Sequence, residues 1–326
     1  MADLNLTIAL ERYDRHVPLF LGSVKPPPGL ALRMLEVGMS HPGRDGIARH
    51  ERFLRNNEFD IAETSLSSHV IATSRGAPFV GIPVFPRRLF SQNHIFVNAS
   101  AGIDKPQDLI GRRVLIRSFQ TTMTVLALGD LTFDYDVPWQ RVRWVLASDE
   151  ALPLGERGGV SVERAPAGAD VSRLLIDGEV DAMIFPHPPA AVLAARERVR
   201  PLFADRKAEA LSYYQRHGCY PIMHLIAFRR PVIEAHPWLA GAIMGMWEEA
   251  KAQSREFYDD PGYAQLAFAR NELETQDAAM GEDPWPSGLA ANRRNLEAFV
   301  RYSLDQRLID DPIAVEQMFH KSTWDS

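Results

Sequence analysis

The sequence predicts an α/β fold built from two successive α/β segments and a mostly helical C-terminal part. Three observations support this prediction. Strand-like apolar runs alternate with helix-like segments over most of the chain, which is typical of parallel βαβ units. After Pro231 the apolar residues recur with the period of a long amphipathic helix. The 326 residues are about twice the length of a common domain, which favours two domains.

The first segment opens on alternating apolar residues at 4–10, which predict a strand. The following elements are inferred from apolar runs and from polar residues that favour helix starts. We expect strands at 32–36, 59–61, 79–85 and 95–97, a helix that contains residues 47–56, and a helix that opens near 65–68.

The second segment and the C-terminal part have clearer boundaries. Asp104 can cap a short helix that has Pro106 in its first turn and ends at Gly111. Another helix begins at Asp170 or Ser172. We expect further strands at 114–116, 180–185 and 220–228, and C-terminal helices from Pro231 to Ala250, around 263–274 and around 289–306.

This order of elements favours two interleaved lobes over two domains in series. If the C-terminal helices return to the first segment, residues 1–88 and 235–326 form one lobe. Residues 89–234 then form a second, inserted lobe. Two lobes joined by two crossings would place a ligand cleft between them.

Composition excludes several classes of function. The formal net charge of −6 argues against a nucleic-acid partner, which would need a clustered basic surface. The single cysteine, Cys219, excludes an intramolecular disulfide and a cysteine-rich metal site. A mean hydropathy of −0.19 and the absence of a long apolar run predict no membrane span. Charged residues in the first fifteen positions do not fit a secretory signal, so we expect a cytoplasmic protein.

Two helix starts are rich in hydroxyl groups and follow predicted strands. The first contains Ser65, Ser67 and Ser68, and the second contains Thr121 and Thr122. Unpaired N–H groups and the helix dipole favour anions at such positions, and hydroxyl groups add donors. In α/β folds this is also the edge where ligands bind. Plain N-capping is the alternative explanation.

Arginine and glutamine side chains extend these candidate sites. Arg117 and Gln120 lie beside the second helix start. The positive charge of Arg117 and the donors of Gln120 favour an anion site there. Arg88 follows two prolines that bracket aromatic residues, which suggests a rigid hinge between the lobes. Its guanidinium could bind a carboxylate through two hydrogen bonds. A surface arginine pair with Arg87 is the alternative.

The ten histidines form no HExxH or HxH arrangement, so the sequence identifies no metal site. His187, at the end of a predicted strand, and His224, in the segment 221–224, are the best candidates to reach a cleft. A structural role in the core is about as common for such histidines. The chain contains no P-loop, GxGxxG motif, GxSxG elbow or lysine context typical of pyridoxal phosphate enzymes.

Taken together, these segments resemble the 4,5-dihydroxyphthalate decarboxylase family over almost the whole chain. The matching segments are residues 58–68, 81–86 with Arg88 and Phe90, 95–98, 108–114, 178–182, 221–224, 236–238, 281–283, 285–288, and 292–293 with Leu296. The chain departs from the family pattern at three places. Ser91-Gln92 replace an Arg-His pair, Arg117-Ser118 replace Pro-Glu, and Ser287 replaces a tyrosine.

The resemblance implies a two-lobed fold of the type 2 periplasmic-binding-protein class and a carboxy-lyase. The implied reaction converts 4,5-dihydroxyphthalate to protocatechuate and CO2. Under this interpretation Glu63, with His224 or His187, transfers protons. The residues assigned to substrate binding are Ser65, Ser67, Ser68, Arg88, Gln120, Thr121 and Thr122.

The aromatic ring can act as its own electron sink, so we expect no organic cofactor. A divalent metal bound by histidine and carboxylate ligands is left open. The expected partner is a small aromatic carboxylate, and a homo-oligomer is an open alternative to a monomer. The alternative functions are a cytoplasmic solute-binding protein of the same fold and a decarboxylase of a different hydroxylated aromatic acid.

Overall fold

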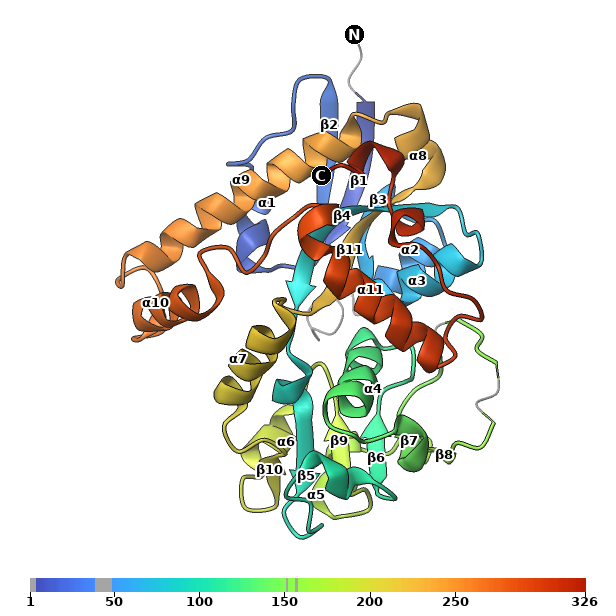
Figure 1. Ribbon diagram of the computed structural model, residues 1–326. Helices are drawn as coiled ribbons and strands as arrows, with labels where there is room; N and C mark the ends of the chain where they lie inside the picture. The colour runs from blue at the N-terminus through green and yellow to red at the C-terminus, as the bar shows by residue number, and fades with distance from the viewer. Residues whose placement is uncertain (1–3, 39–48, 151, 156–157) are drawn as a thin grey trace. The chain divides into compact units, whose positions relative to one another are not determined.

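The computed structural model describes residues 4–38, 49–150, 152–155 and 158–326, and it divides the chain into two compact units. The first unit comprises residues 1–88, 222–297 and 313–326. The second comprises residues 89–221 and 298–312. Each is an α/β unit with its own sheet (Figure 1).

The sheet of the first unit has the strand order β2-β1-β3-β11-β4. Strands β1 (Leu4–Leu10), β2 (Leu30–Glu36) and β3 (Ile61–Ser65) are parallel. Strand β11 (Ile222–Arg229) lies between β3 and β4 (Phe79–Arg88) and is antiparallel to both. The carboxyl ends of β1, β3 and β4 and the amino end of β11 therefore meet at one edge of the sheet.

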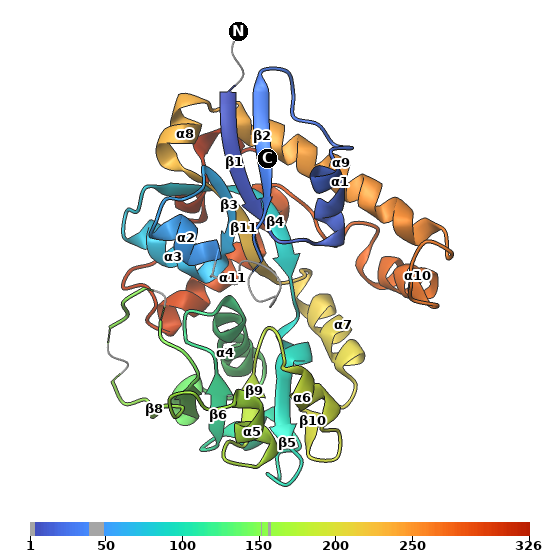
Figure 2. The ribbon, with the colours of Figure 1, turned by 180° about the vertical axis from the view of Figure 1, so that it is seen from behind.

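The core of this unit forms between the sheet and helix α9 (Leu239–Asp259). The helix buries Ile243, Met246 and Trp247 against strand residues such as Ile8 and Ile226. The helix crosses one face of the sheet. It lies in front of the strands in Figure 1 and behind them in Figure 2, the view from the opposite side. The remaining α-helices are α1 (Val17–Leu21), α2 (Arg49–Leu54), α3 (Leu66–Ser74), α8 (Arg230–Ala235), α10 (Ala269–Met280) and the first part of α11 (Leu289–Asp305).

The sheet of the second unit has the order β10-β5-β9-β6-β7-β8. Its strands are β5 (Ile95–Asn98), β6 (Arg113–Ile116), β7 (Arg143–Leu146), β8 (Val162–Arg164), β9 (Ala182–Ile184) and β10 (Val199–Pro201). Strands β6 to β9 are parallel to one another, and β5 is antiparallel to both β9 and β10. Its helices are α4 (Thr122–Asp134), α5 (Val171–Ile176), α6 (Ala190–Ala194), α7 (Arg206–His217) and the last part of α11.

The unit boundaries differ from the predicted lobes at two places. Residues 222–234 fall in the first unit because β11 hydrogen-bonds to β3 and β4 there. Residues 298–312 fall in the second unit. In this segment Gln306 donates to the Val125 carbonyl of α4 at 2.8 Å, and Tyr302 packs so closely that a Cβ on Gly129 would overlap its ring.

Most predicted elements are confirmed, with shifted ends. Strand β3 starts at Ile61 and continues to Ser65, and β4 continues three residues beyond the predicted end. The predicted helix over 47–56 corresponds to α2 (Arg49–Leu54). Residues 47–48 of the predicted range lie outside the described residues. Helix α10 starts six residues later than predicted, because Tyr263 and Leu266 lie in an exposed turn. Across the described ranges, no helix has the length and apolarity needed to cross a bilayer.

Candidate active site

The sheet edge of the first unit gathers ionisable side chains from four strands. Glu11 and Tyr13 follow β1, Glu63 lies near the end of β3, and Arg87 lies near the end of β4. His224 lies near the start of β11. Because β11 is antiparallel to its neighbours, its first residues reach the same edge as the last residues of β3 and β4. The ligand-binding edge of an α/β sheet is thus lined with titratable groups.

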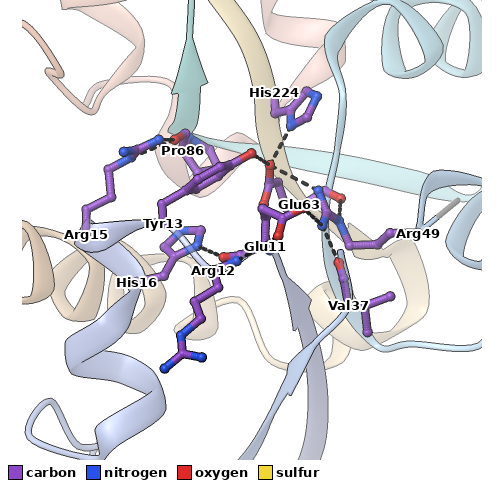
Figure 3. Close-up of polar contacts among 10 residues, drawn as sticks. All are labelled: Glu11, Arg12, Tyr13, Arg15, His16, Val37, Arg49, Glu63, Pro86 and His224. Atoms are coloured by element: carbon purple, nitrogen blue, oxygen red, sulfur yellow. Dashed lines mark hydrogen bonds and ion pairs between the residues drawn. The ribbon is translucent and has the colours of Figure 1, made fainter. Parts of the chain in front are cut away.

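Glu63 is the centre of this cluster, and its side chain is fully buried. Its Oε1 atom accepts hydrogen bonds from the Tyr13 hydroxyl at 2.9 Å and from Nδ1 of His224, and it forms an ion pair with Arg49 Nη2 at 3.1 Å. Its Oε2 atom accepts from the backbone N–H of Glu11 at 3.0 Å. Figure 3 shows these groups converging on the carboxylate.

These partners fix the charge of Glu63. Burial by itself would raise the pKa of this carboxyl group, but the charge of Arg49 and the hydrogen bond from His224 outweigh burial. The pKa of Glu63 therefore lies well below its ordinary value. Arg49 also donates from Nε to the Glu63 carbonyl at 2.8 Å, so the arginine holds both the side chain and the strand.

His224 is the second central residue, and its protonation state follows from that of Glu63. Burial lowers the pKa of His224 to about 4, although the bond to Glu63 acts in the opposite direction. The ring is therefore neutral near pH 7. Since an ionised carboxylate can only accept, Nδ1 carries the proton. The lone pair then lies on Nε2, which makes no hydrogen bond within the described part of the chain. Such an atom can act as a base.

Two further histidines lie beside this pair. The His50 ring meets the His224 ring edge-on, with centroids 5.0 Å apart. His16 is fully buried, and its Nδ1 lies 2.6 Å from the Glu11 carbonyl oxygen. Burial lowers the pKa of both groups, that of His16 to about 4. In the part of the chain that is described, no three His, Cys, Asp or Glu residues are arranged to hold a metal ion.

The predicted serine cluster forms the start of α3 next to the site. The Ser65 hydroxyl accepts a hydrogen bond from the Ser68 N–H at 3.4 Å and lies 3.2 Å from the Ser67 hydroxyl. All three side chains are buried. This is the N-capping arrangement that the sequence left open as the alternative. Their role in substrate binding stays a prediction.

Arg88 is used differently from what the sequence suggested. Its buried Nη2 donates to the Asn292 side chain at 2.6 Å and to the Pro286 carbonyl at 3.0 Å. Its guanidinium thus connects β4 to the region before and within α11. Binding of a substrate carboxylate by Arg88 stays a prediction.

The second predicted helix start lies in the other unit and contains a carboxylate of its own. Glu150 accepts hydrogen bonds from the backbone N–H groups of Phe119 and Gln120 at 2.8 and 2.9 Å. The Gln120 side chain exchanges hydrogen bonds with the backbone of Leu152. Thr121 and Thr122 begin α4 directly after this turn. The chain therefore supplies an internal anion where the sequence predicted a substrate anion.

Of the predicted catalytic residues, the structure brings together Glu63 and His224. His187 lies in the second unit, after β9, and is exposed. Three further residues of the site were not predicted from the sequence: Tyr13, Arg49 and Arg87. The signal for Tyr13 was its position just after a predicted strand, and for Arg87 its place beside Arg88. For Arg49 the sequence held no signal, because an arginine on a predicted surface helix is ordinarily solvated.

Comparisons with solved structures show the fold. The periplasmic aliphatic sulphonate binding protein SsuA from Escherichia coli is 15% identical, with a TM-score of 0.59 over 97% of this chain and 92% of that protein. The alkanesulfonate-binding protein SsuA from Xanthomonas axonopodis pv. citri is 14% identical, with a TM-score of 0.60 over 98% and 99%. The chain therefore has the fold of type 2 periplasmic binding proteins, as predicted.

Comparisons of sequence show the family, although no family model matches the chain. A 4,5-dihydroxyphthalate decarboxylase of Comamonas testosteroni is 32% identical over 100% of this chain and 99% of its own length. A 4,5-dihydroxyphthalate decarboxylase of Pseudomonas putida is 31% identical over 66% of this chain and 83% of its own length. The chain belongs to the 4,5-dihydroxyphthalate decarboxylase family.

Proposed function

We propose that this protein is a carboxy-lyase that converts 4,5-dihydroxyphthalate to protocatechuate and CO2, with Glu63 and His224 as its proton-transfer pair. Membership of the decarboxylase family supports the reaction and the substrate. The observation that carries the assignment of the site is the buried hydrogen bond between the Glu63 carboxylate and Nδ1 of His224, which leaves Nε2 unprotonated and able to accept a proton.

The chemistry follows from the positions of the substituents on the ring. Each hydroxyl group of the substrate is para to one carboxylate. When a base removes the proton from this hydroxyl, its electrons move through the ring to the carbon that bears the carboxylate. That carbon takes a proton, and the C–C bond to the carboxylate then breaks. CO2 leaves, the bonding electrons return to the ring, and the phenolate regains a proton. The balance is one proton consumed and one CO2 released.

In this scheme His224 accepts the phenolic proton at Nε2. Its imidazolium form then lies beside the ionised Glu63, which stabilises the new charge. Arg49 and the N–H of Glu11 keep Glu63 ionised and oriented. We also propose that no organic cofactor is needed, because the ring itself stores the electron pair between protonation and loss of CO2.

The central experiment incubates the protein with 4,5-dihydroxyphthalate and measures CO2 and protocatechuate. In D2O, we expect one deuterium at the ring carbon that lost its carboxylate. His224→Gln should lower kcat by about 10²- to 10⁴-fold, the usual contribution of a positioned base. His69→Gln is the matched control, because His69 is an equally buried histidine of the same unit that bonds to the Met318 carbonyl.

We expect His69→Gln to keep kcat within about twofold. Binding of the substrate without release of CO2 would contradict the proposed reaction and favour a solute-binding protein. Turnover of another hydroxylated aromatic acid, but not of this one, would overturn the substrate and keep the reaction type. Equal kcat values for His224→Gln and His69→Gln would remove His224 from the mechanism.

A further inference from the structure

Two consecutive arginines end strand β4, and their side chains have different surroundings. Arg88 is buried and bonded to Asn292 and Pro286. Arg87 is half-buried, and no hydrogen bond or ion pair joins its side chain to another residue in the described ranges. A cation that is partly removed from water and has no counterion is costly. Such a group is therefore a candidate to receive an anion from outside the chain.

The backbone that carries Arg87 is held on both sides. Nε of Arg15 donates to the Pro86 carbonyl at 2.7 Å, and the Arg15 guanidinium lies over the rings of Tyr13 and Trp285 at 4.3 and 4.1 Å. On the other side, Arg88 is anchored to α11 through Asn292. Figure 3 shows the contact between Arg15 and Pro86 next to the Glu63 cluster. Arg87 is therefore presented from a fixed segment, which reduces the entropy lost on binding.

Arg87 also lies close to the proton-transfer pair. It lies opposite His224 in the antiparallel pairing of β4 and β11, at a point where the register shifts. The pairing places the two backbones next to each other, and the bulge at this point breaks the regular alternation of faces along the strands. The electrostatics agree with this placement, because the charge of Arg87 helps burial to lower the pKa of His224 and of His50.

We propose that Arg87 is the residue that binds the retained carboxylate of the aromatic substrate. This inference rests on the proposed function. A guanidinium matches a carboxylate through two parallel hydrogen bonds. The departing carboxylate must become neutral CO2, so a cation bound to it would stabilise the reactant more than the transition state. The cation therefore serves the carboxylate that stays on the ring.

Binding at Arg87 also couples recognition to catalysis. In the free protein the charge of Arg87 makes His224 a weaker base. A bound carboxylate neutralises that charge, so the basicity of His224 rises when the substrate is in place. The chain as a whole has a net charge of −6, so capture of a dianion depends on such a local cation.

The test measures binding by calorimetry with two ligands that share the ring. Phthalate carries two carboxylates and no hydroxyl group, so it cannot react by the proposed mechanism, and catechol carries no carboxylate. Arg87→Gln should weaken phthalate binding by about 10- to 100-fold, the usual effect of losing a charge-assisted hydrogen-bonded pair. Catechol binding should stay within twofold. Arg87→Lys should recover part of the phthalate affinity, and circular dichroism checks the fold of each variant.

Arg33→Gln is the matched control, because Arg33 is an exposed arginine on β2 of the same sheet. Equal phthalate affinity in Arg87→Gln and Arg33→Gln would overturn the inference. A second readout is the acid limb of the kcat/KM profile. Loss of a positive charge near His224 raises the pKa of that histidine, so this limb should move to higher pH in Arg87→Gln but not in Arg33→Gln.

The two proposals fail in different ways. If the parent protein binds phthalate through Arg87 but releases no CO2 from 4,5-dihydroxyphthalate, the proposed function is wrong and the anion site remains. If the parent protein decarboxylates the substrate and Arg87→Gln has the same KM and phthalate affinity, only the role of Arg87 is wrong. A parent protein that binds neither ligand would contradict both.

Discussion

Glu63 in the first unit and Asp130 in the second are both buried carboxyl groups, yet their surroundings favour opposite charges. Both side chains are at most 1% exposed. Glu63 contacts Arg49, His224 and Tyr13, and its pKa is held well below the ordinary value. Asp130 accepts hydrogen bonds from three hydroxyl groups, and burial raises its pKa to about 7. The partners of a buried acid, and not burial itself, decide whether it is ionised.

This difference corresponds to two uses of a buried acid. The Asp130 carboxyl group joins three elements of the second unit, because its hydroxyl partners are Ser91, Tyr213 of α7 and Tyr302 of α11. Those hydroxyls can bond to a neutral acid as well as to a carboxylate. The Glu63 carboxylate must stay charged to hold Arg49 and to fix the proton of His224 on Nδ1. A neutral acid is suited to structure, and a charged one is suited to orienting a base.

The largest expected effect comes from removing the charge of Glu63. Glu63→Gln removes the nearer carboxylate of the buried Arg49 and leaves only the longer ion pair with Glu11 at 4.0 Å. We therefore expect the free energy of unfolding to fall by about 3–5 kcal/mol at pH 7. The amide can also donate to Nδ1 of His224 and favour the wrong tautomer, so kcat should fall by about 10²- to 10⁴-fold. Thermal unfolding and steady-state kinetics measure the two effects.

Asp60→Asn is the control for this variant. Asp60 precedes β3, pairs with Arg229 and accepts hydrogen bonds from Thr7 at 2.9 Å, but lies at the opposite end of the strand. We expect it to lower stability while kcat stays unchanged. If both variants lost stability equally and both kept kcat, Glu63 would be a structural acid like Asp130. The proposed difference between the two acids would then be wrong.

The same change from acid to amide at Asp130 should raise the free energy of unfolding instead of lowering it. The pKa of Asp130 is raised from 3.8 in the unfolded chain to about 7 in the folded protein. As pH rises from about 4 to about 7, the unfolded chain ionises this group while the folded protein resists, so stability falls. At about 1.4 kcal/mol per pKa unit, the loss is on the order of 4 kcal/mol. Asp130→Asn cannot ionise and should therefore be more stable than the parent at pH 8.

Denaturant unfolding at a series of pH values tests this prediction. The stability difference between Asp130→Asn and the parent should grow between pH 4 and pH 7 and then level off. The amide oxygen can still accept from Tyr213 and Tyr302, and the amide N–H groups can donate to the Ser91 hydroxyl. A variant that is less stable than the parent at every pH would show that Asp130 is ionised in the folded protein.

The sequence revealed much of the fold and the separate members of the site, but not how the members meet. Glu63 and His224 were both predicted as proton-transfer residues through the resemblance to the decarboxylase family. Their contact joins residues 161 positions apart. It depends on β11 inserting between β3 and β4, and apolar periodicity does not determine which strands become neighbours.

The choice between Arg87 and Arg88 depended on where β4 ends. The predicted strand stopped at residue 85, which left both arginines in a loop. In the structure the strand continues to Arg88, and its alternation sends the two side chains to different surroundings. The burial of Asp130 could not be predicted from the sequence for a similar reason. It lies on an apolar helix, and its burial comes from Tyr213 and Tyr302, which are remote in sequence.

The smallest expected effects come from removing one tyrosine hydroxyl group beside the buried acid of each unit. Tyr13→Phe removes a hydroxyl that donates to ionised Glu63 at 2.9 Å, and Tyr302→Phe removes one that donates to Asp130 at 3.4 Å. Hydrogen bonds to charged groups contribute about 1.5–3 kcal/mol, and neutral ones about 0.5–1.5 kcal/mol. Chemical denaturation at pH 6, below the pKa of Asp130, should therefore rank Tyr13→Phe as the more destabilising. Equal losses would mean that both acids carry the same charge at that pH. That result would contradict the inference that Arg49 keeps Glu63 ionised while the three hydroxyl partners of Asp130 leave it neutral.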